Sequence, residues 1–126
     1  MSKEGIDLGR LAEDSAADFL KTNGYKIIRR NYRNKLGEVD IIAKDKDTIC
    51  FVEVKYRSSD KFGLPSEAVS ALKQRRISKV ALSFLKDKGL LEERARFDVI
   101  TVSQDDKANK IELIKNAFEL GGGSNI

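Results

Sequence analysis

The chain has 126 residues, no histidine, a single cysteine (Cys50) and a formal net charge of +4. Histidine-based catalytic triads and an internal disulfide are therefore excluded, a zinc site is not expected, and any bound metal should be a hard cation held by oxygen atoms. The length predicts a single domain over residues 1–120, and the glycine-rich end, 121–126, is expected to be a flexible tail.

The first half of the chain predicts one helix and three strands. The helix is expected over 8–23, where apolar residues recur every three or four positions before a stop at Gly24. The strands are expected over 25–33, 38–44 and 48–56, joined by turns at 35–37 and 45–47.

A polar loop over 57–66 leads into the second half. A second helix is expected over 70–88, with Ser70 as its N-cap, and two strands over 96–102 and 110–114. The order α-β-β-β-α-β-β predicts an α/β fold in which helices flank a central mixed β-sheet. The start is polar, without the apolar core of a signal peptide, and the apolar runs are too short to span a membrane. We therefore expect a cytoplasmic protein that does not associate with membranes.

Two carboxylates stand where strands usually carry apolar residues. Glu53 follows the apolar run 49–52, and a hairpin turn at 45–47 would place Asp40 opposite Val52 or Glu53. Side chains alternate along a strand, so Asp40 should share a face with Glu38 and Ile42, and the other face should carry Val39, Ile41 and Ala43. In the next strand one face should carry Cys50, Val52, Val54 and Tyr56, and the other Ile49, Phe51, Glu53 and Lys55. A register slip of one residue would separate the two carboxylates.

Adjacent carboxylates repel each other, and a divalent cation would reverse that effect. Lys55 lies two residues after Glu53, so its ammonium group should point to the same side, where it could stabilise charge on a phosphoryl group. The alternative is that Glu53 and Lys55 form a solvent-exposed ion pair of little consequence. The apolar surroundings of Glu53 favour the functional interpretation.

The motifs Gly37-Glu38-Val39-Asp40 and Glu53-Val54-Lys55 resemble those of the PD-(D/E)XK nuclease superfamily. A wider set, which includes Gly9-Arg10, Asn31-Tyr32-Arg33 and Phe97-Asp98, resembles the YraN-type uncharacterised bacterial family within it and spans residues 9 to 118. The resemblance implies a restriction-endonuclease-like fold and metal-dependent hydrolysis of DNA phosphodiester bonds. One departure is Val39, where the superfamily often has proline.

The resemblance also assigns roles to individual residues. Asp40 and Glu53 match the metal-binding acids, the backbone carbonyl of Val54 matches a further ligand, and Lys55 matches the catalytic lysine. Glu13 matches an acid that archaeal Holliday-junction resolvases place near the metal, although a surface glutamate is an equally open interpretation. The expected cofactor is Mg²⁺ or Mn²⁺.

Basic residues concentrate in two segments, 23–37 and 70–91. Those expected to contact DNA phosphates are Arg29, Arg30, Arg33, Lys35 and Arg57, with Lys73 reaching the site from the second helix; each could instead lie on a solvated face. Tyr32 is expected in the core rather than against a base, Cys50 in the core, and Asp98 in a structural salt bridge with Arg96 or with an arginine elsewhere.

The sequence thus predicts a metal-dependent endonuclease-like protein that acts on DNA, in processing, repair or recombination. Two alternatives stay open: a non-catalytic nucleic-acid-binding protein that keeps the fold, and a Holliday-junction resolvase that acts as a homodimer.

Overall fold

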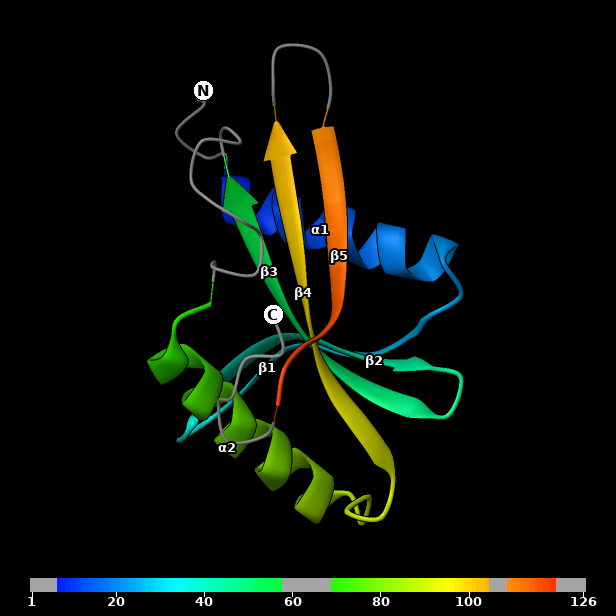
Figure 1. The fold of residues 1–126 in the computed structure, drawn as a ribbon, viewed down its shortest axis with the longest axis vertical. Coiled ribbons are helices and arrows are strands. Elements are labelled where there is room, and N and C mark those ends of the chain that lie inside the picture. Colours follow the sequence, from blue (N-terminus) through cyan, green and yellow to red (C-terminus); the bar gives the residue numbers. More distant parts are fainter. Residues whose placement is uncertain (1–6, 58–68, 105–108, 120–126) are drawn as a thin grey trace.

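The computed structural model describes residues 7–57, 69–104 and 109–119 of the chain (Figure 1). The elements in chain order are α1 (Leu8–Thr22), β1 (Lys26–Asn34), β2 (Gly37–Asp45), β3 (Thr48–Arg57), α2 (Ala71–Asp87), β4 (Arg94–Gln104) and β5 (Asn109–Phe118). The predicted order and α/β class are confirmed, and each helix starts after a capping side chain, Asp7 or Ser70. The expected tail at 121–126, and the expected loop beyond Arg57, lie outside the described residues.

The sheet is mixed, with strand order β1-β2-β3-β4-β5. Neighbouring strands are antiparallel except β3 and β4, which are parallel. A parallel pair needs a long crossover connection, and helix α2 lies in that connection. The connection from β3 to β4 therefore places α2 across one face of the sheet.

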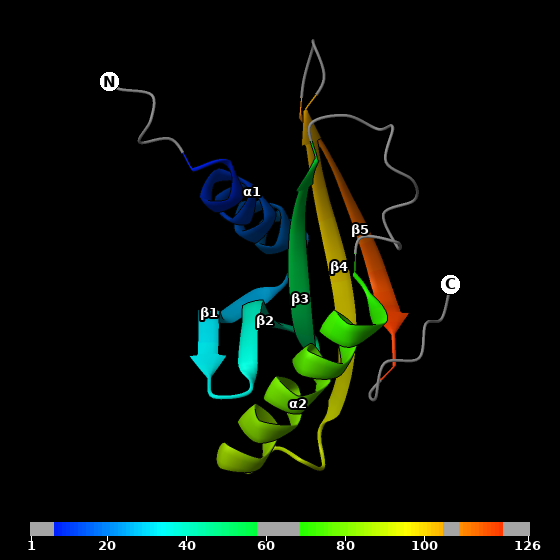
Figure 2. The same ribbon diagram turned by 90° about the vertical axis from the view of Figure 1, so that its left-hand side faces the viewer.

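The two helices cover opposite faces of the sheet, as Figure 2 shows. The cluster on the α1 face includes Ala16 and Leu20 of the helix with Cys50 and Val52 of β3. The cluster on the α2 face unites these side chains of the helix and the strands: Ile77, Val80, Phe84, Ile49, Phe51, Phe97 and Phe118. Complete burial of one such aliphatic or aromatic side chain is worth roughly 1.5–3 kcal/mol, so the two layers hold the sheet between the helices.

Alternation along β3 follows the prediction, whereas alternation along β2 does not. Ile41 and Ala43 belong to the α1-side cluster as expected, but Val39 packs in the α2-side cluster with Ile42. The expectation that Val39 shares a face with Ile41 is therefore wrong. Opposite this break, Asn31 of β1 has φ +53°, a left-handed conformation that turns the edge strand out of regular pleating.

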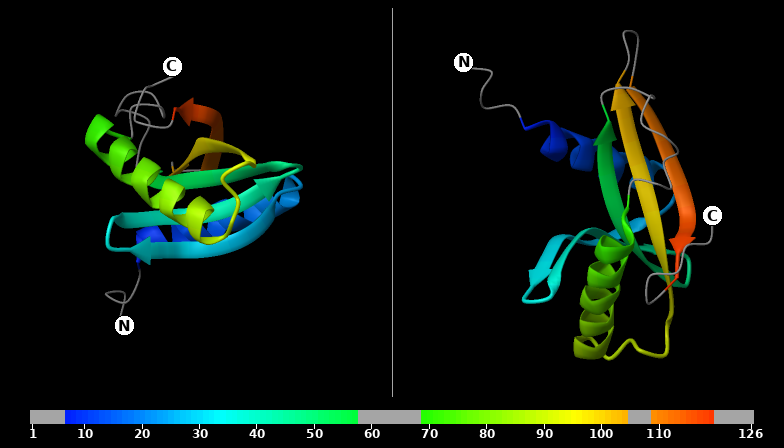
Figure 3. Two further views of the ribbon diagram at one scale, coloured as in Figure 1. Left: turned by 90° about the horizontal axis from the view of Figure 1, so that it is seen from below. Right: turned by 60° about the vertical axis from the view of Figure 1, so that its left-hand side comes forward.

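The N-terminal end of β2 and the turn before it lie beside α2. Figure 3 shows the β1–β2 hairpin turning away from the long strands β3, β4 and β5 toward this helix. Gly37 has φ +147°, and a β-carbon there would lie 3.3 Å from the side chain of Val80. The amide of Asn34 also donates a hydrogen bond to Ser83, at 3.3 Å. Glycine thus lets the hairpin approach the helix closely.

Strands β4 and β5 both extend beyond their predicted ends, and in β5 a buried aspartate supports the bulge at which the extension begins. Asp98 is fully buried, accepts a hydrogen bond from the backbone N–H of Asn116 at 2.9 Å, and accepts two from Arg96 at 3.0 and 3.2 Å. Asn116 has φ +53°, and the pairing of the strands shifts between Phe97 and Val99. The predicted salt bridge of Asp98 is confirmed, and it lets β5 continue to Phe118.

Cys50 is buried in the core, as predicted, and burial raises the pKa of its thiol to about 12. Neither of the described helices is both long and apolar enough to cross a membrane.

Candidate active site

The site forms where β2 separates from β3. Backbone pairing of the two strands runs from Asp45–Thr48 to Ile41–Val52. Beyond that point, within the part of the chain that the structure describes, β3 pairs with β4 alone. The backbone N–H of Val54 donates instead to a side-chain oxygen of Asp40, at 2.8 Å. The carboxylate of Asp40 therefore takes the place of a strand carbonyl and lies against β3.

A cavity of about 380 Å³ opens at this separation. It is lined from three elements: by Gly37, Glu38 and Asp40 of β2, by Glu53 of β3, and by Ser70, Leu72, Lys73, Arg76 and Ile77 at the start of α2. The predicted pair Asp40 and Glu53 is thus brought together, on the side of the sheet that α2 covers.

Glu53 is the most buried acid of this cavity, with a side chain only 4% exposed. Its carboxylate contacts the ammonium group of Lys73. Burial, followed by the nearby charge of Asp40, raises the pKa of Glu53 to about 7, against the opposing effect of Lys73. A carboxyl group that exchanges its proton near neutral pH is uncommon outside functional sites.

Two lysines accompany this carboxylate. Burial, and then the charge of Lys73, lower the pKa of Lys55. Burial also acts to lower the pKa of Lys73, but its contact with Glu53 outweighs this effect, and the pKa is raised. Lys55 therefore gives up a proton more readily than an ordinary lysine, whereas Lys73 is held as a cation. Lys73, expected from the sequence either as a contact from the second helix or as a residue of a solvated face, contacts Glu53 here, and its role toward DNA stays a prediction.

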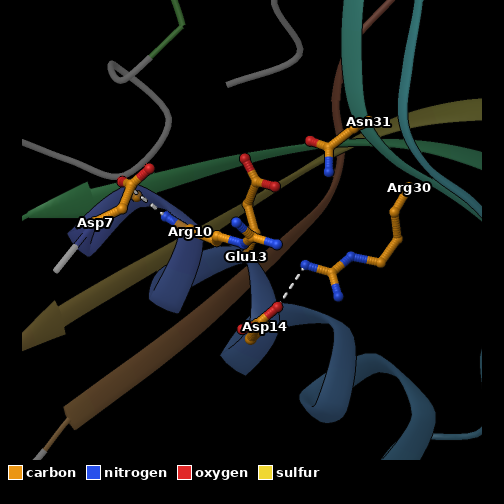
Figure 4. Close-up of a pocket in the computed structure, with 7 residues that line it drawn as sticks. Asp7, Arg10, Glu13, Asp14, Arg30 and Asn31 are labelled. Carbon is orange, nitrogen blue, oxygen red and sulfur yellow. Dashed lines mark hydrogen bonds and ion pairs between the residues drawn. The ribbon is translucent and has the colours of Figure 1, made fainter. Parts of the chain in front are cut away.

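Glu13 lies in a neighbouring cavity of about 510 Å³, between α1 and β1. Figure 4 shows its carboxylate pointing toward Asn31, with Arg10 and Arg30 nearby. Burial, and then the charge of Asp40, raise the pKa of Glu13. Among the residues that the structure describes, no group of three or more acidic or cysteine side chains could hold a metal. Glu13 therefore adjoins the Asp40–Glu53 pair without completing a cluster of three.

Of the basic residues predicted to contact phosphates, Arg30 and Lys73 line the two cavities, and Arg30 and Arg33 have acidic partners. Arg30 pairs with Asp14 at 2.7 Å, and Arg33 with Glu38 at 3.4 Å. Lys35 is exposed at the β1–β2 turn, and Arg57 is half-buried at the end of β3. Their roles toward DNA stay predictions.

Tyr32 belongs to the core rather than to a binding surface, as predicted. Its ring packs edge-on against Phe84, with ring centroids 5.2 Å apart. Arg29 covers the ring, with its guanidinium carbon 5.3 Å from the centroid. The cation of Arg29 is thus partly engaged within the protein.

Arg76 and Asn31 also line these cavities, and the sequence predicted no role in the site for either of them. Arg76 lines the carboxylate cavity three residues after Lys73, and this helical spacing places both cations on one face of α2. The sequence contains this spacing, so the position of Arg76 beside Lys73 could have been predicted from it. Asn31 reaches the Glu13 cavity through its left-handed conformation, which nothing in its neighbours indicates.

Comparisons with known proteins agree with the sequence resemblance. The sequence model of the uncharacterised protein family UPF0102 matches residues 12–102. A UPF0102 protein of Syntrophus aciditrophicus is 52% identical over 120 residues, which cover 95% of this chain and 94% of that one. Another, of Desulforapulum autotrophicum, is 50% identical over 119 residues, covering 94% and 98%.

The comparison of structures gave SfsA of Pyrococcus furiosus in complex with Ca²⁺, with 14% sequence identity and a TM-score of 0.36. The match covers 86% of this chain and 60% of that chain. The family match and the two relatives confirm the YraN-type family predicted from the motifs. The chain belongs to the uncharacterised protein family UPF0102.

Proposed function

We propose that this protein is a metal-dependent nuclease that hydrolyses phosphodiester bonds of DNA. The observation that carries the proposal is the buried carboxylate of Glu53, which faces a second carboxylate and lies within reach of two lysines. Asp40 and Glu53, with the backbone carbonyl of Val54, would hold Mg²⁺ or Mn²⁺, and Glu13 would contribute from the adjoining cavity. A DNA substrate would place the protein in the cytoplasm.

The chemistry of this donor set fits a hard divalent cation. Mg²⁺ is commonly held by one or two carboxylates, while water and phosphate oxygens complete its coordination. The charge of Asp40 and a hydrogen bond with it both favour the protonated form of Glu53. A cation between the two groups would replace that repulsion with attraction, and this supports the proposed metal site.

The residues of the site would then have distinct roles. When bound, the metal would polarise the scissile phosphate and lower the pKa of an attacking water molecule. Lys55 would donate a hydrogen bond to that water or to the oxygen on which negative charge builds up. Burial of Glu53 beside the start of α2 would exclude bulk water and strengthen these interactions.

The basic residues around the cavities would bind the DNA backbone. Arg30 and Arg33 lie on β1, Arg57 on β3, Lys35 at the β1–β2 turn, and Lys73 on the helix. Contacts of this kind release counterions and fix the position of the duplex without reading its sequence.

The decisive experiment is a cleavage assay on supercoiled, branched and flapped DNA with Mg²⁺ or Mn²⁺. The wild-type protein should cut, and Glu53→Ala and Lys55→Ala should lower the rate by about 100-fold or more. Glu92→Ala and Lys86→Ala change exposed charges elsewhere and should cut like the wild type.

Two results would redirect the proposal. If the wild-type protein binds these substrates but cuts none of them with any metal, the non-catalytic nucleic-acid-binding alternative is correct. If a dimer cuts only four-way junctions, the resolvase alternative is correct.

A further inference from the structure

We propose that the ammonium group of Lys73 takes the place of the divalent cation in the metal-free protein, so that the incoming metal must displace Lys73 from Glu53. This inference rests on the proposed metal site, and it concerns what regulates the occupancy of that site. It makes Lys73 a competitor of the metal first and a candidate phosphate contact only afterwards.

The contacts of Glu53 carry the argument. Its side chain is almost completely buried, and a buried carboxylate needs a compensating charge. Lys73 supplies that charge by direct contact from the first turn of α2. Because a carboxylate oxygen that faces an ammonium group cannot face a metal at the same time, the two cations compete for it.

The helix itself disfavours a cation at the position of Lys73, and the contact with Glu53 compensates for this. Lys73 is the third residue of α2, and its backbone N–H is capped by the hydroxyl of Ser70 at 3.2 Å. The positive end of the helix dipole disfavours a cation there, and the first turn contains no acid to offset it. The compensating partner lies instead across the cavity, on β3.

The two partners differ in their freedom to move. The side chain of Lys73 is 40% exposed and that of Glu53 only 4% exposed. Lys73 can therefore withdraw into solvent, whereas Glu53 stays in the cavity. Arg76, also exposed, lines the same cavity, so a displaced Lys73 would join a second cation at its rim.

This exchange would couple the metal to DNA. A backbone phosphate at the rim offers the displaced ammonium a new partner and so lowers the cost of its leaving Glu53. By linkage, the metal and the DNA should then each raise the affinity for the other.

The test is calorimetric titration of the full chain with MnCl₂ at pH 8, above the pKa of about 7 that burial gives Glu53. Lys73→Met keeps an unbranched side chain of similar length without the charge. We expect this variant to bind Mn²⁺ about five- to tenfold more tightly than the wild type, as is typical of coupled ligands at one site. Lys79→Met removes an exposed charge from the same helix and should bind like the wild type.

A second variant shows that the measured ion occupies the proposed site. Adding Glu53→Gln to Lys73→Met should abolish the tight binding, and far-ultraviolet circular dichroism checks that each variant folds. Should Lys73→Met not fold, Lys73→Gln serves in its place.

Three results would overturn the inference, and they are distinguishable from one another. Equal affinity of the wild type and Lys73→Met, with binding that depends on Glu53, leaves the metal site in place but removes the competition. Binding that persists without Glu53 places the ion elsewhere. If neither protein binds Mn²⁺, the metal site itself fails, and with it the competition.

Discussion

The carboxylate of Asp40 accepts a hydrogen bond from the backbone N–H of Val54 at 2.8 Å, and this single contact both ends a β-ladder and builds a site. An aspartate that replaces a strand carbonyl carries a full negative charge to the edge of β3. That charge lies beside Glu53, the residue before Val54, and adds to the effect of burial in raising the pKa of its carboxyl group. The contact therefore stabilises the backbone while it creates repulsion between two side chains.

This double role predicts opposite effects of two substitutions at Asp40. Asp40→Asn keeps an oxygen acceptor for the N–H of Val54 and removes the repulsion, so it should stabilise the metal-free protein by about 0.5–1 kcal/mol. Asp40→Ala leaves that N–H without its acceptor and should be less stable than Asp40→Asn by about 1–3 kcal/mol. Urea unfolding at pH 8 with a chelator measures both. Equal stability of the two variants would contradict the role of Asp40 as a backbone acceptor.

The raised pKa of Glu53 predicts that the stability of the protein depends on pH. Its pKa is about 7 in the folded protein, against 4.5 for the ordinary group, so the folded state holds the proton more tightly. The resulting stabilisation is complete below pH 4.5 and is lost as the pH rises through 7. Relative to Glu53→Gln, which mimics the protonated form, the wild type should lose about 1–3 kcal/mol of unfolding free energy between pH 5 and 8.

Urea unfolding of both proteins across this pH range, without metal, gives the difference directly. Groups common to the two proteins cancel in the comparison. Parallel curves would show that Glu53 is ionised in the folded protein at all these pH values.

A bound cation should offset the same repulsion. At pH 8, Mn²⁺ at 100 times its dissociation constant should stabilise the wild-type protein by about 2.7 kcal/mol, because the ligand binds only the native state. Thermal melting should show a higher Tm for the wild type, with little change for Asp40→Asn or Glu53→Gln. Asp18→Asn, an exposed change on α1, should respond like the wild type. A response of Glu53→Gln equal to that of the wild type would place the ion outside the proposed site.

The sequence predicted the elements of the fold and the two carboxylates of the site, because both leave local signals. Apolar alternation placed Cys50 and Phe51 on opposite faces of β3, where the structure has them. The acid that interrupts this apolar run, Glu53, was the strongest functional signal, and it is buried at the site.

Features that depend on long-range geometry could not be predicted in the same way. Val39 faces α2 beside two irregularities, the left-handed conformation of Asn31 and the hydrogen bond between Asp40 and Val54. Neither can be predicted from the alternation of apolar and polar residues along a strand. The contact between Lys73 and Glu53 depends on how α2 crosses the sheet. The sequence could therefore indicate that Lys73 lies near the site, but not that it contacts Glu53.

DNA binding should reveal whether the hairpin contributes phosphate contacts. Lys35→Ala should lower the affinity for all DNA sequences alike and should reduce the slope of log K against log salt by about 1. Lys86→Ala removes an exposed cation from the far end of α2 and should leave the slope unchanged. Fluorescence anisotropy over a salt series, in Ca²⁺ or a chelator, measures the slope. An unchanged slope for Lys35→Ala would place this turn outside the DNA interface.

A last prediction concerns the buried ion pair that supports β4 and β5. Besides its two bonds to Asp98, Arg96 donates to the hydroxyl of Tyr25 at 2.7 Å and to Asp45 at 2.9 Å. Arg96→Leu would leave the fully buried Asp98 without its counter-charge, so we expect a loss of about 3–5 kcal/mol in unfolding free energy. Guanidinium unfolding measures this loss.

Arg94 is the matched control on the same strand. It lies 3.9 Å from Asp47, with side chains 79% and 73% exposed, so Arg94→Leu should cost less than about 0.5 kcal/mol. Adding Asp98→Asn to Arg96→Leu should recover part of the loss, because the unpaired charge is removed together with its partner. If the double variant is as unstable as Arg96→Leu, the cost arises from lost packing and not from the charge of Asp98.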